Sequence, residues 1–188
     1  LLSADEVAAR VQALAAEIAP RIDDDSVCIC LLTGGIWFAA DLMRALAGLG
    51  RHPLFDALWL SSYQDGQTSV GRVEVRSALQ RPLEGRQALL IDDVIDSGLS
   101  LAEAARIARE AGAREVLSAV FAAKPWPRPR TCEPDFVAWT APDRFLIGYG
   151  MDAAGRYRGL PGVWGAPEPS PRERGEGSDI WKQNANML

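Results

Sequence analysis

The sequence predicts an α/β domain with a mostly parallel central sheet flanked by helices. Short apolar runs alternate along the chain with segments whose apolar residues recur at helical spacing. The runs are continuously apolar, as in strands buried on both faces, and do not alternate with polar residues. The chain has 188 residues, which fits one domain of the usual size of roughly 100–200 residues with a substantial core.

The first helix is expected to begin after Ser3. Ser3 has the residue type of an N-cap, and Glu6 stands three residues later, which is the capping-box pattern. The apolar residues that follow at helical spacing, as far as Pro20, are Val7, Val11, Leu14 and Ile18.

The next part of the chain predicts strands separated by a helix. Residues 27–32 form an apolar run, followed by Thr33-Gly34-Gly35 and a helix over about 36–49 that Gly50 ends. Residues 55–61 predict another strand, 62–71 a polar loop or hairpin tip, and 72–77 an exposed strand.

A β-α-β unit is then expected in the middle of the chain. Its parts are a buried strand at 87–91, a polar turn at 92–100, a helix at 101–110 capped by Gly112, and a strand at 116–122.

The C-terminal part has a different composition. An irregular Pro-rich segment follows Lys124, and two short strands are expected at 136–139 and 145–149. From Pro167 the chain is rich in Pro, Gly, Ser and charge, so we expect residues 167–188 to be flexible or held by a partner surface.

Charge and hydropathy exclude several classes of function. Twenty Lys and Arg stand against 25 Asp and Glu, a net charge of −5. A nucleic-acid coat or a membrane-surface binder needs a basic footprint, so neither partner is expected. No run approaches the ~20 apolar residues of a membrane span, and we expect no secretory leader.

Histidine and cysteine usage narrows the chemistry further. The only histidine, His52, precedes Pro53 in an expected turn, which excludes Cys₂His₂ and HExxH zinc sites and disfavours a Ser-His-Asp triad. Three cysteines form no secreted disulfide framework, which indicates a cytoplasmic protein. Cys28 and Cys30 are expected to pack on one face of a buried strand rather than to form a metal or redox pair.

The central chemical feature is the acidic segment that follows the apolar run 87–91. Asp92 and Asp93 come first, then Asp96, then Ser97-Gly98-Leu99-Ser100 opening a helix. Ligands of open α/β sheets bind beyond the carboxyl ends of strands, and a helix N-terminus suits a phosphate. Carboxylates beside a phosphate fit a ligand whose hydroxyl groups or divalent cation they bind, so the segment indicates a phosphorylated sugar with Mg²⁺.

The same acidic segment fits three alternatives less well. An Asp-rich helix cap needs only one aspartate. A nucleoside triphosphatase needs GxxxxGK[ST], which is absent. A phospho-acceptor receiver domain carries its acidic pair near the chain start, whereas this one is in the middle.

Residues 91–100 resemble the phosphoribosyl-diphosphate-binding motif of type I phosphoribosyltransferases, and Val94-Ile95-Asp96-Ser97-Gly98 is most similar to the hypoxanthine–guanine enzymes. The resemblance spans about residues 2–163. Segments similar to the family's pyrophosphate loop and helix, its mobile loop, its central motif and its purine-binding hood follow in that order: 31–35 with 38–42, 61–63 with 68–71, 91–100, and 123–125 with 134–137 and 142–152.

The resemblance implies the type I phosphoribosyltransferase fold, with one domain over 1–166 and a small hood made from about 1–20 and 124–166. It also implies roles in the central motif. Asp92 and Asp93 would hold the ribose hydroxyls, partly through Mg²⁺, and Asp96 would be the general base near purine N7. The 5′-phosphate would be wrapped by Ser97, Gly98, Leu99 and Ser100.

Base recognition is implied for three residues of the hood. Lys124 would bind the 6-oxo group, Phe145 would stack on the purine, and the backbone of Leu146 would contact the purine edge. The alternatives are a solvated lysine for Lys124 and a core side chain for Phe145.

The remaining implied roles concern pyrophosphate and the second metal. Thr33 and Gly34 would bind pyrophosphate in a loop that has a non-proline cis peptide, here Leu32–Thr33, and Arg158 would reach the same group. Asp152 would bind a second Mg²⁺ or its water shell. The alternative for Arg158 is a surface arginine. Thr33 stands where many relatives carry Lys or Arg, which puts the strength of pyrophosphate binding in question.

Ser62 and Tyr63 would open the mobile loop, and the alternative for them is the plain end of a strand. The loop at 62–71 would close over a sugar cation that water can attack.

The implied activity is purine salvage, in which hypoxanthine or guanine and phosphoribosyl diphosphate give IMP or GMP and pyrophosphate. The resemblance also implies a homodimer or homotetramer. The alternatives are a xanthine-preferring enzyme and a non-catalytic regulator that senses nucleotides and binds RNA. A regulator is expected to show a basic patch and loss of the general base, whereas Asp96 is present.

Overall fold

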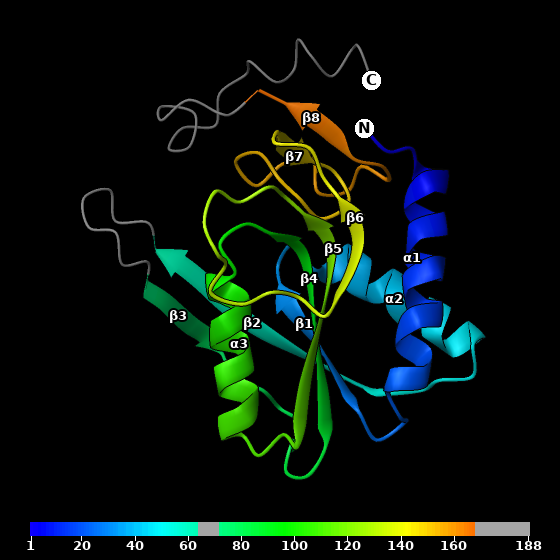
Figure 1. The fold of residues 1–188 in the computed structure, drawn as a ribbon, viewed down its shortest axis with the longest axis vertical. Coiled ribbons are helices and arrows are strands. Elements are labelled where there is room, and N and C mark those ends of the chain that lie inside the picture. The colour runs from blue at the N-terminus through cyan, green and yellow to red at the C-terminus, as the bar shows by residue number, and fades with distance from the viewer. Residues whose placement is uncertain (64–71, 168–188) are drawn as a thin grey trace.

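A six-stranded sheet forms the centre of the molecule in the computed structural model, which describes residues 1–63 and 72–167 (Figure 1). Its strands are β1 (Val27–Leu32), β2 (Leu54–Tyr63), β3 (Arg72–Ser77), β4 (Gln87–Ile95), β5 (Glu115–Ala123) and β6 (Phe136–Thr140). The helices are α1 (Ala4–Ile18), the short 3₁₀ helix η1 (Ala19–Arg21), α2 (Ile36–Gly48) and α3 (Leu99–Glu110). The predicted α/β class with a mostly parallel sheet is confirmed.

The strand order places a ligand-binding crevice at one point of the sheet. The order is β3-β2-β1-β4-β5-β6, and every pairing is parallel except that of β2 with β3 at the edge. The chain leaves β1 toward β2 and later returns to the other side of β1 with β4. Ligands of such sheets bind where the strand order reverses, here beyond the carboxyl ends of β1 and β4.

Helices cover both faces of the sheet, which accounts for the continuous apolar runs. α1 and α2 lie on one face and α3 on the other (Figure 1). Successive side chains of β1 enter the two cores in turn: Cys28 and Cys30 pack with α1 and α2, and Ile29 packs with α3. The prediction that both cysteines share a buried face is confirmed, and burial raises the pKa of each thiol to about 12.

The expected start of α1 is confirmed in detail. The Ser3 hydroxyl accepts a hydrogen bond from the Glu6 backbone N–H, and the Glu6 carboxylate accepts one from the Ser3 N–H at 2.8 Å. The four apolar positions predicted to face the core are buried. This helix packs against α2 and β6.

Several element boundaries differ from those expected: the strand expected at 145–149 ends at Ile147, and the short strand Trp164–Ala166 was not expected. β4 continues through the aspartates to Ile95, although a turn was expected from Asp92, because residues 92, 94 and 95 remain paired with β5. The neighbouring strand outweighs the low strand propensity of aspartate. α3 begins at Leu99 instead of 101, and β2 extends to Tyr63 by pairing with Arg72 of β3.

A second, smaller sheet stands over the carboxyl ends of the central strands. It consists of β7 (Phe145–Ile147) and β8 (Trp164–Ala166), and a bridge between Leu2 and Val163 joins the N-terminus to it. β6 is a strand of the central sheet, and α1 packs in the main body, so the hood holds less of 1–20 and 124–166 than the resemblance implied.

Residues 168–188 of the tail expected at 167–188, and residues 64–71 of the loop expected at 62–71, lie outside the described residues. The division into a domain of 1–166 and a tail stays a prediction. Among the described residues, no helix has the length and hydrophobicity needed to cross a membrane.

Candidate active site

Asp92 and Asp93 stand near the end of β4, beside the loop that follows β1. Asp93 is 9% exposed, and its carboxylate lies against Gly34 so closely that a Cβ there would stand 1.9 Å from Asp93 Oδ2. A side chain at this position of the loop would therefore displace the Asp93 carboxylate. The peptide bond between Leu32 and Thr33 is cis, as the resemblance implied.

Burial raises the pKa of both carboxyl groups, and the charge of Asp93 raises that of Asp92 further. Two adjacent carboxylates, one buried and the other half-buried, are costly without a cation. Mg²⁺ is commonly bound through one or two carboxylates plus oxygens of a substrate. Across the described ranges, no group of three or more His, Cys, Asp or Glu residues is arranged to hold a metal alone. The pair fits a cation that shares its ligands with a substrate.

The turn between β4 and α3 presents backbone N–H groups to an anion. Gly98 is the N-cap residue of α3 with φ of +79°, a conformation that favours glycine. Gly98 has no side chain that could accept a hydrogen bond from the first turn, and the Leu99 N–H makes a long bond of 3.5 Å to the Ser97 hydroxyl. Ser97 and Ser100 flank this helix terminus, where the helix dipole adds a partial positive charge.

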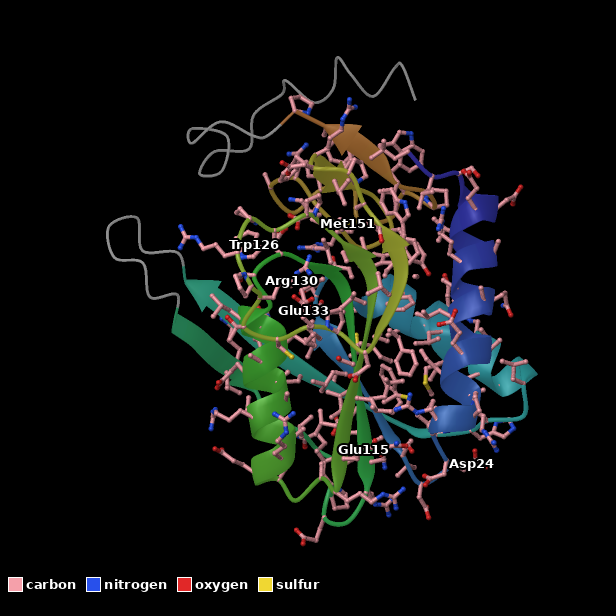
Figure 2. All side chains as sticks on the ribbon, in the orientation of Figure 1. Asp24, Glu115, Trp126, Arg130, Glu133 and Met151 are labelled. Carbon is pink, nitrogen blue, oxygen red and sulfur yellow. The ribbon has the colours of Figure 1, made fainter. Side chains whose placement is uncertain are left out.

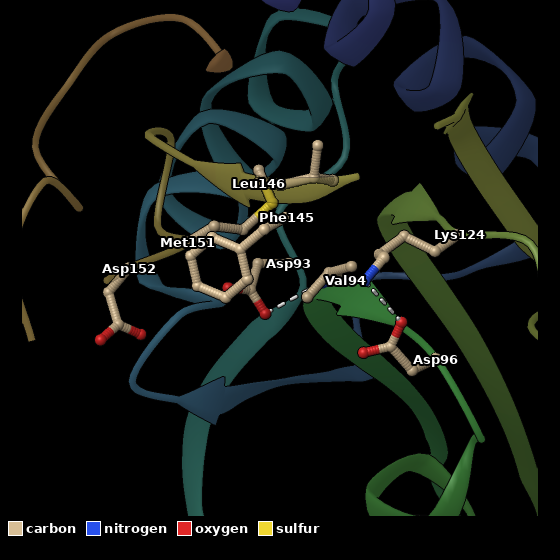
Figure 3. Close-up of a pocket in the computed structure, with 8 residues that line it drawn as sticks. All are labelled: Asp93, Val94, Asp96, Lys124, Phe145, Leu146, Met151 and Asp152. Carbon is tan, nitrogen blue, oxygen red and sulfur yellow. Dashed lines mark hydrogen bonds and ion pairs between the residues drawn. The ribbon is translucent and has the colours of Figure 1, made fainter. Parts of the chain in front are cut away.

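A pocket lies between the central sheet and the smaller sheet of β7 and β8 (Figure 3). Its lining residues come from β4, the end of β5 and the hood: Asp93, Val94, Asp96, Lys124, Phe145, Leu146, Met151 and Asp152. The Lys124 amine and the Asp96 carboxylate point toward each other with Nζ and Oδ1 3.3 Å apart. Lys124 is 21% exposed and Asp96 49%, so both side chains remain accessible to a ligand.

Asp152 and Arg158 form a tight pair at the edge of the hood. Arg158 Nη2 lies 2.6 Å from Asp152 Oδ1, and Arg158 Nη1 donates to the Gly150 carbonyl. The other Asp152 oxygen accepts from the Gly155 N–H at 2.5 Å. Both side chains are about one-quarter exposed. The aspartate therefore orients the arginine.

The hood docks directly onto the loop that follows β1. A Cβ at Gly150 would stand 2.1 Å from the Gly34 carbonyl oxygen. The neighbouring Tyr149 donates its hydroxyl hydrogen to Asp41 of α2 at 3.0 Å. These contacts tie the position of the loop to that of the hood.

The structure brings together Asp93, Asp96, Lys124, Phe145, Leu146 and Asp152, which the resemblance singled out. The pocket is not lined by Asp92, Thr33, Gly34, Ser97 to Ser100 or Arg158, although Gly34 lies against Asp93 and Arg158 pairs with Asp152. Ser62 and Tyr63 belong to β2, paired with Val73 and Arg72, while the loop they were expected to open lies outside the described residues.

Sequence reasoning missed Val94 and Met151 as lining residues. Both are apolar neighbours of residues already singled out, Asp93 and Asp152 respectively, so adjacency was the available signal. It also missed the contact of Gly150 with Gly34, for which the sequence carries no signal.

Comparisons with known proteins agree on one family. Residues 2–154 match the family model described as the phosphoribosyl transferase domain. The chain is 35% identical over 162 residues to the hypoxanthine-guanine phosphoribosyltransferase of Bacillus subtilis, covering 86% of this chain and 88% of that protein.

Solved structures give the same result. A hypoxanthine-guanine phosphoribosyltransferase of Bacillus anthracis aligns with a TM-score of 0.79 at 27% identity, over 88% of this chain and 96% of that one. A hypoxanthine-guanine-xanthine phosphoribosyltransferase aligns with a TM-score of 0.75 at 26% identity, over 90% and 96% of the two chains.

Proposed function

The chain belongs to the phosphoribosyltransferase family, with hypoxanthine-guanine enzymes as relatives, and from this premise we propose that it transfers phosphoribosyl to N9 of hypoxanthine or guanine. Phosphoribosyl diphosphate is the donor, and the products are IMP or GMP and pyrophosphate. The observation that carries the proposal is the pairing of Lys124 with Asp96 at 3.3 Å in a pocket shared with Phe145. A cation, a carboxylate and an aromatic ring are what a 6-oxopurine needs.

The lysine accounts for selectivity among purines. An ammonium group is a donor only, so it pairs with a 6-oxo group and not with the 6-amino group of adenine. A buried donor left without its acceptor costs about 1–3 kcal/mol, which disfavours adenine. Phe145 stacks on the base, and the Leu146 backbone contacts its edge.

Asp96 accepts the proton during transfer. N9 attacks ribose C1 as the bond from C1 to the pyrophosphate oxygen breaks, and the carboxylate takes the proton that the purine loses, at N7. Lys124 beside Asp96 stabilises the negative charge of this carboxylate before the transfer. The sugar carries positive charge in the transition state, and the buried Asp93 lies close to its expected place.

The phosphate groups bind at two places. The backbone of Ser97 to Ser100, at the start of α3, takes the 5′-phosphate. The loop of Thr33 and Gly34 takes the pyrophosphate, and Arg158, oriented by Asp152, neutralises its charge.

Asp92 and Asp93 would hold Mg²⁺ together with the ribose hydroxyls and pyrophosphate, and Asp152 would hold a second ion or its water shell. When bound, the metal supplies charge stabilisation on the leaving pyrophosphate. The raised pKa of both carboxyl groups supports this part of the proposal, because a cation relieves their repulsion.

Xanthine use is the alternative within the class. The structural relative described as hypoxanthine-guanine-xanthine phosphoribosyltransferase favours keeping it. Xanthine differs from hypoxanthine at C2, whose edge is read by backbone near Leu146. The non-catalytic regulator is disfavoured by the presence of Asp96 in the pocket.

We also propose a homodimer or homotetramer in the cytoplasm. Phe55 and Trp59 on the face of β2 opposite α3 are 43% and 41% exposed, and such an apolar patch is typical of a subunit interface. Three unpaired cysteines are consistent with a reducing compartment. Light scattering of the purified protein measures the oligomeric state.

The test of the activity is a spectrophotometric assay with Mg²⁺ and phosphoribosyl diphosphate, offering hypoxanthine, guanine, xanthine and adenine separately. Turnover of 6-oxopurines without adenine is the expected result, and it also ranks xanthine. Turnover of adenine at a comparable rate would contradict the role of Lys124. Tight nucleotide binding without turnover of any base would favour the regulator.

A further inference from the structure

The segment that follows β5 runs alongside the turn between β4 and α3. Residues 130, 131 and 132 meet residues 96, 97 and 98 in register. The Thr131 N–H donates to the Ser97 carbonyl at 2.9 Å, and the Cys132 backbone lies so close to Gly98 that a Cβ there would meet its oxygen at 2.5 Å.

Arg130 extends this contact to the pocket. Its Nε donates to the Asp96 carbonyl at 2.8 Å, and its Nη2 donates to the Lys124 carbonyl. One guanidinium group therefore spans the backbones of the two residues whose side chains form the 3.3 Å pair of the pocket. The Lys124 N–H also donates to the Ile95 carbonyl, so these two strand ends are bonded to each other as well.

The side chain of Arg130 is held firmly. It is 15% exposed, and its Nη1 contacts the Glu133 carboxylate at 2.9 Å. Arg130 and Glu133 lie side by side near the start of α3 (Figure 2). Glu133 is 63% exposed, so this ion pair contributes little by itself and mainly sets the direction of the guanidinium group.

We propose that Arg130 is a positioning residue that sets the distance between Asp96 and Lys124, and thereby between the proton acceptor and the 6-oxo group of the base. The inference rests on the proposed function. Arg130 lines no part of the pocket and acts only through the two carbonyl groups. The purine offers N7 and O6 at a fixed separation, so the two side chains must be held at a matching one.

Arginine suits this task better than lysine. Its planar fork directs separate N–H groups at two acceptors, whereas an ammonium group is a point charge on a flexible stem. A shift of ~1 Å in a group that orients a substrate can cost about 10²-fold in rate. The loss is expected in turnover of the base, because phosphoribosyl diphosphate is bound by other groups.

The test compares Arg130→Gln and Arg130→Lys with Arg128→Lys. Arg128 is an exposed arginine of the same segment and serves as the matched control. Steady-state kinetics give kcat and KM for hypoxanthine, and calorimetry gives the affinity and stoichiometry for phosphoribosyl diphosphate with Mg²⁺. The stoichiometry counts folded sites, so a variant that merely unfolds is recognised.

We expect kcat to fall about 10²-fold in Arg130→Gln and about tenfold in Arg130→Lys, with one site per chain and donor affinity within about twofold of the wild type. The Arg128 variant should match the wild type. Wild-type kcat in both Arg130 variants would overturn the inference, as would equal losses of turnover and donor sites. A wild type that neither turns over nor binds a 6-oxopurine would overturn the proposed function, and the inference with it.

Discussion

The contact of Gly150 with Gly34 gives a sharp prediction for Gly150→Ala. Gly150 has φ of +99°, and the added Cβ would stand 2.1 Å from the Gly34 carbonyl oxygen. Real Cβ atoms almost never approach a neighbour closer than 3.0 Å, so the hood and the loop must separate by about 1 Å. A displacement of ~1 Å can cost about 10²-fold in rate.

The expected result distinguishes an effect on the pyrophosphate loop from an effect on the rest of the site. Pyrophosphate affinity and kcat should each fall by up to about 10²-fold, because Gly34 belongs to the proposed pyrophosphate loop. Affinity for IMP should fall less than affinity for pyrophosphate, because the 5′-phosphate binds at the start of α3, which lies outside the hood and the Gly34 loop. Calorimetry with each ligand and a steady-state assay measure these quantities.

Gly155→Ala is the matched control. Gly155 also has positive φ, at +78°, but an added Cβ there meets nothing within 4 Å. Both variants carry the backbone cost of about 1–2 kcal/mol for a non-glycine residue in this conformation, so both should lower Tm. Equal pyrophosphate affinity in the two variants would refute the reasoning, because only the Gly150 change moves the loop.

Three further predictions concern the carboxylates and the lysine. Asp96→Asn should lower kcat by roughly 10²–10⁴-fold with substrate affinity largely kept, since the amide cannot accept the proton; unchanged turnover would remove Asp96 from its role. Lys124→Ala should raise KM for hypoxanthine by about 10–150-fold, the worth of one charged hydrogen bond, and leave donor affinity unchanged; equal losses for both ligands would contradict it. Asp92→Asn should raise Tm at pH 7 in the absence of metal. Burial and the charge of Asp93 raise the pKa of Asp92 in the folded protein above its value in the unfolded chain. The folded protein therefore loses stability as pH rises from the unfolded pKa to the folded pKa of Asp92. Thermal melts between pH 4 and 7 should show the variant's advantage growing with pH, and a constant difference would contradict the shift.

Local sequence patterns were sufficient to predict much of the fold. The capping box of Ser3, the buried strand with Cys28 and Cys30, and the exposed strand at 72–77 depend on neighbours in sequence or on burial of the sheet faces. The acidic segment at the end of β4 was also predictable from the sequence, because an apolar run is followed closely by three aspartates and a serine-glycine turn.

Element boundaries that depend on strand pairing were harder to predict from the sequence. β4 continues through Asp92 and Asp93 because β5 pairs with it, and β6 joins the central sheet rather than the hood. Neither outcome follows from the residue types of the segment itself, since a neighbouring strand can outweigh local propensity.

The sequence by itself determined the order of elements as far as β7, the chemistry of the acidic segment and the residue types offered to a ligand. Only the tertiary structure decided which of them meet. Lys124 faces Asp96, Gly150 closes on Gly34, and Arg130 bonds to the backbone of both strand ends. These contacts join residues that are far apart in the chain, and their geometry depends on how strands, loops and hood pack, which no local spacing encodes.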